Sequence, residues 1–193
     1  MSKFIEDSDM KIVGSKKLTK EDGFDVIQLV EETKAQRFNG NWAKAKALGA
    51  NIVSAFSYKA APDDLLQLIK EHNIEVTDEL LLQMKILTVF SAEFCIDSFL
   101  PSSMLSTVAV GELYEVLENI SPEFYEELSK STAFSFYYLC LDKDGEEADR
   151  CIGEQFAGIC GKKGDKAYVS LGAELHKINV KVFRKAIQTF RFV

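Results

Sequence analysis

Apolar residues are densest between residues 77 and 100, and this pattern predicts a helix that is covered on several sides. The last fifteen residues of the segment carry only two charges, Glu93 and Asp97, so a helix would be apolar around most of its circumference. Thr77 offers an N-cap hydroxyl, and the two acids that follow it suit the first turn of a helix. Pro101 ends the pattern. We therefore expect residues 77–100 to form the central helix of the protein.

Helical spacing of apolar residues, separated by capping and turn signals, continues on both sides of this segment. Helices are predicted over residues 19–38, with Val30 on the buried side, from Trp42 to Phe56, and from Pro62 to His72. Later helices begin at Ser102 or Ser103, Ser121, Asp144 and Asp165. Gly49 lies on the buried face of the second helix, where it permits close approach by another backbone. The last helix is expected either as one helix bent near Asn179 or as two.

One stretch is ambiguous, because the aromatic residues of 134–141 suit a short strand as well as a helix. In either case the pattern predicts an all-α protein, an irregular or orthogonal bundle of about seven or eight helices around residues 77–100. Residues 1–18 have no sustained period and are expected to form a partly disordered arm. The remaining residues, 19–193, are expected to form a single helical domain.

Composition adds expectations about the cellular compartment. No apolar run approaches the ~20 residues that a membrane-spanning helix needs, and the first 17 residues lack the apolar region of a secretory signal. We expect a cytoplasmic protein without membrane contact. The cysteines form no C-x-x-C pair and are therefore expected to be free, buried thiols. They are Cys95, Cys140, Cys151 and Cys160.

Charge is distributed unevenly along the chain. Between Lys85 and Lys130 there are eight acidic residues and no Lys or Arg, whereas residues 175–193 carry five cations and no acid. The net charge of −7 argues against a nucleic-acid partner, because phosphate binding requires a basic face. The two segments either neutralise each other within one molecule, or the basic end docks on another protein or a second copy. The partner-binding candidates are Arg184, Lys185, Glu112 and Glu115.

Glu93 and Asp97 are four residues apart and would share a face of the central helix. Two neighbouring carboxylates are suited to metal binding or acid–base chemistry, but on an exposed face they would only mark the solvent side. The Glu-x-x-His signature of di-metal helical bundles is absent from the sequence. Phosphate-loop and calcium-loop spacings are absent as well, so no cofactor is expected.

Aromatic residues near position 136 form a second candidate site. Phe134, Tyr137 and Tyr138 could line a pocket for an apolar or planar ligand, with the tyrosine hydroxyls fixing its orientation. Aromatic clusters also form ordinary hydrophobic core, and the sequence does not decide between these two interpretations.

Three hypotheses for the function follow. The first is a non-catalytic, cytosolic interaction or regulatory domain that uses a helical face to bind another protein or itself, for example as a homodimer. The second is a small-molecule-binding bundle with a pocket beside residues 134–138. The third is a carboxylate-based metal enzyme centred on Glu93 and Asp97. The sequence has two histidines and no nucleophile elbow, so no catalytic arrangement emerges from it, and this favours the first hypothesis.

Overall fold

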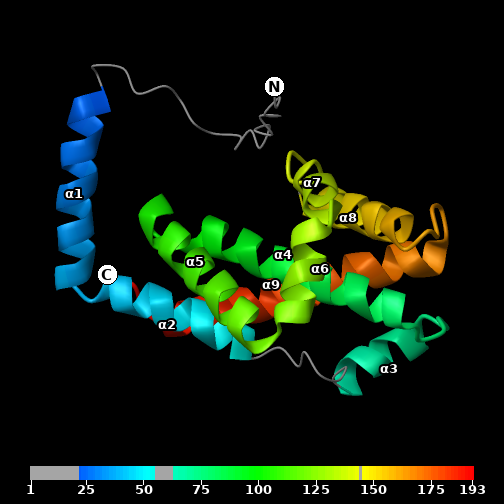
Figure 1. The fold of residues 1–193 in the computed structure, drawn as a ribbon. Coiled ribbons are helices and arrows are strands. Elements are labelled where there is room, and N and C mark those ends of the chain that lie inside the picture. The colour runs from blue at the N-terminus through cyan, green and yellow to red at the C-terminus, as the bar shows by residue number, and fades with distance from the viewer. Residues whose placement is uncertain (1–21, 55–62, 144) are drawn as a thin grey trace, which may run out of the picture.

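The structure is a computed structural model that describes residues 22–54, 63–143 and 145–193, with side chains from residue 28 onward. Over this part of the chain it contains nine α-helices and no strand, which confirms the predicted all-α class (Figure 1). Within the same ranges, no helix combines the length and the hydropathy that crossing a bilayer requires. The expected N-terminal arm, residues 1–18, lies outside the described residues.

The helices are α1 (Asp22–Phe38), α2 (Asn41–Ser54), α3 (Asp63–Glu71), α4 (Asp78–Phe99), α5 (Ser103–Ile120), α6 (Pro122–Lys130), α7 (Ala133–Tyr138), α8 (Gly145–Ile159) and α9 (Lys166–Thr189).

Helix α4 is the central helix, as its apolar pattern predicted. The Thr77 hydroxyl accepts a hydrogen bond from the Leu80 backbone N–H at 3.1 Å and so caps its N-terminus. Helices α5, α7, α8 and α9 all pack against it. Its buried residues extend from Leu80 to Ile96 and are distributed around the helix. The helix ends at Phe99, just before Pro101. Figure 1 shows α4 crossing the middle of the bundle.

The ambiguous aromatic stretch forms a helix, α7, and not a strand. The predicted helix from Pro122 does not continue into it, because the backbone turns extended at Ser131. The Ser131 hydroxyl then accepts a hydrogen bond from the Ala133 N–H at 3.2 Å and starts α7. With this break the described residues form nine helices, where about seven or eight were expected. Ser121 precedes α6 as predicted but makes no capping hydrogen bond with its side chain.

The last helix, α9, is a single helix of 24 residues. The Asp165 carboxylate caps it by accepting hydrogen bonds from the backbone N–H groups of Ala167 and Tyr168. Its main contacts are with α4 and α8, so it spans the bundle along the central helix. The sequence allowed one helix bent near Asn179 or two helices, and the structure has a single helix.

Two pairs of helices approach closely through glycines. A Cβ at Gly49 of α2 would lie 2.3 Å from the Ala109 carbonyl oxygen of α5, and a Cβ at Gly153 of α8 would lie 2.2 Å from the Val169 carbonyl oxygen of α9. Neither distance is compatible with a real side chain. The close approach predicted at Gly49 is therefore confirmed, and α5 is the helix that makes it.

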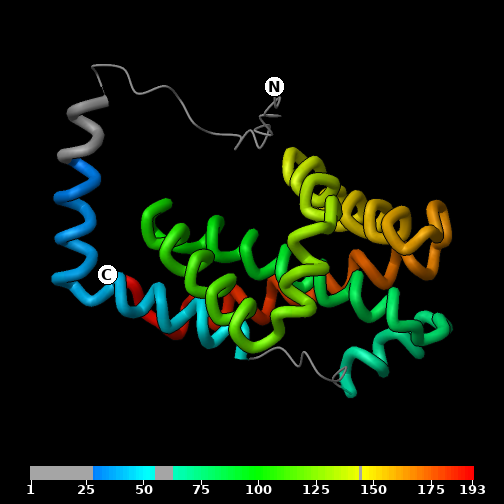
Figure 2. The backbone as a smooth tube through the Cα atoms, viewed as in Figure 1, coloured from blue at the N-terminus to red at the C-terminus, as the bar shows by residue number. Residues whose placement is uncertain are grey.

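Helix α1 corrects a prediction about burial. Val30 was expected on a buried face, but it is 46% exposed. The reason is visible in Figure 2, where α1 extends away from the other helices and meets them at its α2 end. An apolar stripe predicts which face a helix would bury, but burial also requires a neighbour.

The cysteines correct a second prediction, because two of the four expected free thiols form a disulfide. Cys140, in the turn after α7, is bonded to Cys151 of α8, with the two Cα atoms 5.6 Å apart. Cys95 and Cys160 are free. The pair has no recognisable motif in the sequence, since only the folding of α7 onto α8 brings the two residues together.

Candidate functional site

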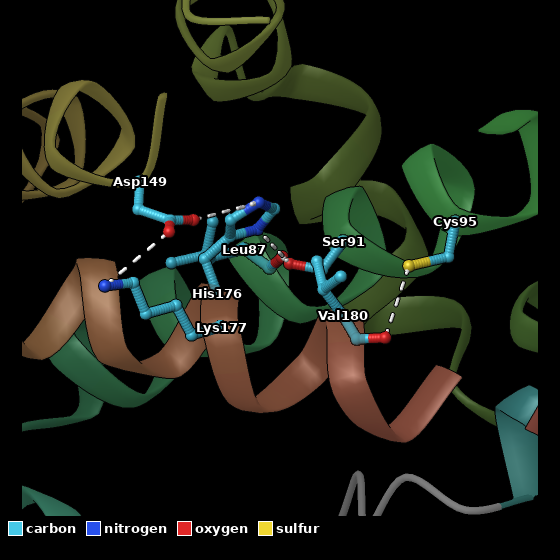
Figure 3. Close-up of polar contacts among 7 residues, drawn as sticks. All are labelled: Leu87, Ser91, Cys95, Asp149, His176, Lys177 and Val180. Carbon is cyan, nitrogen blue, oxygen red and sulfur yellow. Dashed lines mark hydrogen bonds and ion pairs between the residues drawn. The ribbon is translucent and has the colours of Figure 1, made fainter. Parts of the chain in front are cut away.

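Three polar side chains from three helices lie in a line that runs from the buried Ser91 outward to the partly exposed Asp149 (Figure 3). His176 of α9 has its Nδ1 2.9 Å from the Ser91 hydroxyl of α4. Its Nε2 faces the Asp149 carboxylate of α8 at 4.0 Å. Lys177 lies on the other side of Asp149, with Nζ 3.6 Å from the second carboxylate oxygen. The arrangement links α4, α8 and α9.

Burial decides the charge of this group. Desolvation lowers the pKa of His176 to about 4, so the imidazole is neutral near pH 7 and its contact with Asp149 is not an ion pair there. Lys177 is instead the cationic partner of Asp149. Burial raises the pKa of the Asp149 carboxyl, while the charge and hydrogen bond of Lys177 act in the opposite direction.

Serine, histidine and aspartate are the residue types of a hydrolytic triad, but the geometry here does not suit nucleophilic attack. The Ser91 side chain is 0% exposed, and its hydroxyl also lies 2.8 Å from the Leu87 carbonyl oxygen one turn earlier. No substrate carbon can approach an oxygen enclosed between two packed helices. The line therefore satisfies buried polar groups and joins three helices.

Sequence reasoning missed this line. Ser91 occurs in the apolar central helix, and His176 occurs on the apolar stripe of the last helix. Buried polar side chains need hydrogen-bond partners. Two polar residues within apolar helical patterns could therefore have indicated that Ser91 and His176 bind each other. Cys95 forms a further link between the same helices, since its buried thiol donates to the Val180 carbonyl at 3.8 Å (Figure 3). Burial raises the pKa of this thiol to about 12, which leaves it unreactive.

Glu93, the stronger of the two carboxylate candidates, is bound by two tyrosines. It accepts hydrogen bonds from the hydroxyls of Tyr114 on α5, at 2.5 Å, and Tyr138 on α7, at 2.6 Å. Burial, and then the negative charge of Glu93, raises the pKa of the Tyr114 phenol. Asp97 is exposed, and partial desolvation followed by the charge of Glu93 raises its pKa. Glu93 thus joins α4 to α5 and α7, and each of its oxygens already has a donor.

The three aromatic candidates gather around one ring. Phe134, Tyr137 and Tyr138 have ring centroids 5.5, 5.1 and 5.3 Å from that of Phe90. Tyr137 is fully buried, and its hydroxyl has no hydrogen-bond partner among the described residues. Tyr138 is 40% exposed. Phe90 fills the space between the three rings, as in a hydrophobic core.

The basic candidates lie on the outward side of α9. A shallow groove of about 690 Å³ runs along this side, lined by Asp149 of α8 at one end and by four cations of α9: Lys177, Lys181, Arg184 and Lys185. The Arg184 guanidinium also lies over the Phe99 ring at the end of α4, 5.0 Å from its centroid. Lys185 is exposed.

The acidic candidates lie elsewhere. Glu112 of α5 is mostly buried and forms an ion pair of 2.9 Å with Lys46 of α2, whereas Glu115 is exposed. In the described ranges, the cations of residues 175–193 form no ion pair with the acids of residues 86–129. The structure therefore does not bring the four partner-binding candidates together within one molecule.

Comparisons of the chain with family models, curated proteins and solved structures gave no match. Among the residues that the structure describes, no three His, Cys, Asp or Glu side chains are grouped so that they could hold a metal ion. The interpretation of the candidate sites therefore depends on their geometry.

Proposed function

We propose that this chain is a non-catalytic protein-interaction domain, and that it binds an acidic helical segment on the outward face of α9. The observation that carries the proposal is a set of exposed residues that we call the basic face: Ile178, Lys181, Val182 and Lys185, flanked by Lys177 and Arg184. Ile178 is 43% exposed and Val182 is 52% exposed, although both are branched apolar side chains.

The spacing of the basic face supports docking of a helix. Ile178, Lys181, Val182 and Lys185 are related as i, i+3, i+4 and i+7, so they share one side of α9. An amphipathic helix presents its contacts with the same spacing. The lysines select for acidic flanks, and the two apolar side chains supply area that gains from leaving water.

The remaining polar groups support a non-catalytic role. Ser91 and His176 are hydrogen-bonded to each other in the core, Asp149 is paired with Lys177, and each oxygen of Glu93 accepts a hydrogen bond from a tyrosine hydroxyl. The small-molecule hypothesis has less support, because Phe90 packs between the three aromatic candidates. A groove of about 1150 Å³ does lie beside Phe136, but none of the three candidates lines it, and most of its lining residues are charged or polar.

We also propose a cytoplasmic location, and this part of the proposal has to account for the Cys140–Cys151 disulfide. Reducing systems keep most cytosolic thiols reduced. The proposal therefore requires that the domain folds with both cysteines reduced. A domain that unfolds in a reducing buffer would contradict the cytoplasmic location without affecting the interaction surface.

Binding of a synthetic probe tests the proposed surface. The probe is a fluorescently labelled helical peptide with Leu at one set of i, i+3, i+4 and i+7 positions and Glu on both flanks. The double variant Lys181→Glu, Lys185→Glu should weaken binding by about tenfold, equivalent to about 1.4 kcal/mol. Lys70→Glu, a reversal at an exposed position of α3, is the matched control and should leave affinity unchanged.

Fluorescence anisotropy gives the affinity, and amide shift mapping by NMR locates the bound peptide. Shifts centred on residues 177–185 are expected. Shifts centred on another helix, or equal binding by the double variant, would contradict the proposal.

A further inference from the structure

We infer that the acidic segment bound by the basic face belongs to a second copy of this chain. The surface that would dock is the acidic face: Glu115, Glu118 and Ile120 of α5 with Glu123 and Glu127 of α6. This inference rests on the proposed function, since it names the partner for the same basic face.

The acidic face is exposed, and in the part of the chain that the structure describes Lys46 and Lys130 act on Glu115 and Glu127 only through space, without an ion pair. The direct ion pairs of these lysines are made by other acids, since Glu112 pairs with Lys46 and Glu126 pairs with Lys130 one turn away. The four acids of the acidic face are exposed, and none forms an ion pair with another residue in the described ranges. Ile120 is 50% exposed among them.

The two faces are complementary in charge, and both contain exposed apolar side chains. The basic face presents two exposed branched apolar side chains, Ile178 and Val182, and the acidic face presents one, Ile120. These side chains would be covered in the same contact as the charges. The sequence around each face is also free of the opposite charge, with no cation between Lys85 and Lys130 and no acid after Glu174. The chain as a whole carries −7, so two copies repel at long range, and this favours contact through a face where the local sign is reversed.

The geometry of such a contact has a consequence for assembly. The basic face of one copy would contact a different surface, the acidic face, of the next copy. In a heterologous contact of this kind, each assembly keeps one unoccupied basic face at one end and one unoccupied acidic face at the other. Further copies can therefore bind until a ring closes. We therefore expect dimers accompanied by larger species.

Two charge-reversed variants provide the test. The first is Lys181→Glu, Lys185→Glu, which makes both faces acidic, and the second is Glu115→Lys, Glu118→Lys, which makes much of the acidic face basic. Each variant alone should be monomeric in native mass spectrometry, at a concentration where the wild type forms dimers and larger species. An equimolar mixture should associate again, because the unchanged basic face of the second variant meets the unchanged acidic face of the first.

Uniform ¹⁵N labelling of one variant distinguishes mixed from identical pairs by mass. All substituted positions are exposed, and circular dichroism checks that each variant is helical. If a reversal unfolds the chain, the neutral variant Lys181→Gln, Lys185→Gln replaces it, and it should also reduce self-association. Raising the salt concentration from about 0.1 M to about 1 M, where screening shortens from ~10 Å to ~3 Å, should dissociate the mixture.

Failure of this inference is distinguishable from failure of the proposed function. A monomeric wild type, or a mixture that forms no mixed species, overturns the inference. If the acidic peptide nevertheless binds to residues 177–185, the basic face serves another protein and the proposed function stands. If the peptide does not bind there either, both are overturned.

Discussion

The α2–α5 and α8–α9 pairs are both built around a glycine that touches the backbone of its neighbour, but the groups beside these contacts differ. Next to Gly49 the polar contribution is one ion pair at the edge, Lys46 with Glu112. The α8–α9 pair contains the buried line to Ser91 of α4 and is joined to α7 by a disulfide.

The two pairs therefore have similar close contacts but should differ in how strongly acid and reductant destabilise them. Lys46 is half-exposed, and ion pairs with a partner in contact with solvent contribute ~0–1 kcal/mol, so the α2–α5 pair depends mainly on apolar packing and backbone contact. The α8–α9 pair depends in addition on the protonation of His176 and on the redox state of Cys140 and Cys151. We expect acid and reductant to act on α8 and α9 before they act on α2 and α5.

The largest expected effect is that of the disulfide. Replacing both cysteines, Cys140→Ala with Cys151→Ala, should lower the free energy of unfolding by about 2–4 kcal/mol, because the unfolded chain loses a cross-link and the folded chain loses the α7–α8 tether. Urea unfolding measures this loss. Hydrogen exchange should become faster in α7 and α8 and stay unchanged in α2 and α5.

Reduction of the wild type by dithiothreitol is the independent check. It should reproduce the effect of the double variant and leave that variant unaffected. Alkylation of four cysteines after the unreduced protein has been unfolded in urea would show that the disulfide is absent in solution, because unfolding exposes the buried Cys95 as well.

The second prediction concerns pH. The pKa of His176 is about 4 in the folded protein, against an ordinary value of 6.5, so the unfolded chain binds a proton at a pH where the folded chain does not. Stability from this residue is complete above pH 6.5 and is lost as the pH falls towards 4. At ~1.4 kcal/mol per pH unit, the loss is about 3 kcal/mol. The raised pKa values of Asp97 and Asp149 act in the opposite direction, because these carboxyls take up protons earlier in the folded state.

Urea unfolding between pH 7 and pH 4 measures the combined effect, and the variant His176→Gln isolates the contribution of the imidazole. The amide can still hydrogen-bond the Ser91 hydroxyl, but it does not titrate. The pH dependence of its stability should therefore be shallower than that of the wild type. Parallel curves for the two proteins would show that His176 titrates normally.

The sequence predicted the elements whose causes are local. The central helix followed from the Thr77 cap and the apolar run after it, and one continuous last helix was among the stated alternatives. The break before α7 was missed because the Pro122 helix and the aromatic stretch have compatible patterns. Its cause is a hydrogen bond from the Ala133 N–H to the Ser131 hydroxyl, a detail of a single turn.

The missed features of the sites all depend on contacts between distant residues. Pairing Ser91 with His176 requires knowing that α4 and α9 are neighbours, 85 residues apart in the chain. Cys140 and Cys151 meet only because α7 folds onto α8. Glu93 and Asp97 share a face as predicted, but the two tyrosines that bind Glu93 come from other helices. The roles of Arg184, Lys185, Glu112 and Glu115 in partner binding stay predictions.

The smallest expected effect is that of the two glycines, and it tests whether the two helix pairs are equally tight. Gly49→Ala and Gly153→Ala should each lower the free energy of unfolding by about 1–3 kcal/mol, because the new Cβ meets a backbone carbonyl that cannot move alone. The expected loss is a net value: the steric cost of the new Cβ exceeds the ~1 kcal/mol by which Ala stabilises a helix relative to Gly. Only Gly153→Ala should also shift the NMR signals of His176, since it displaces α9.

Matched controls come from the same helix pairs. Gly111 of α5 and Gly158 of α8 have nothing within 4 Å of an added Cβ, so Gly111→Ala and Gly158→Ala should each stabilise the protein by about 0.4–1 kcal/mol. Urea unfolding of all four variants separates intrinsic helix propensity from the cost of contact. If Gly153→Ala is as stable as Gly158→Ala, α8 and α9 do not touch at this point. The polar contacts of His176 would then hold α8 and α9 together, and the α8–α9 pair would lack the glycine–backbone contact found between α2 and α5.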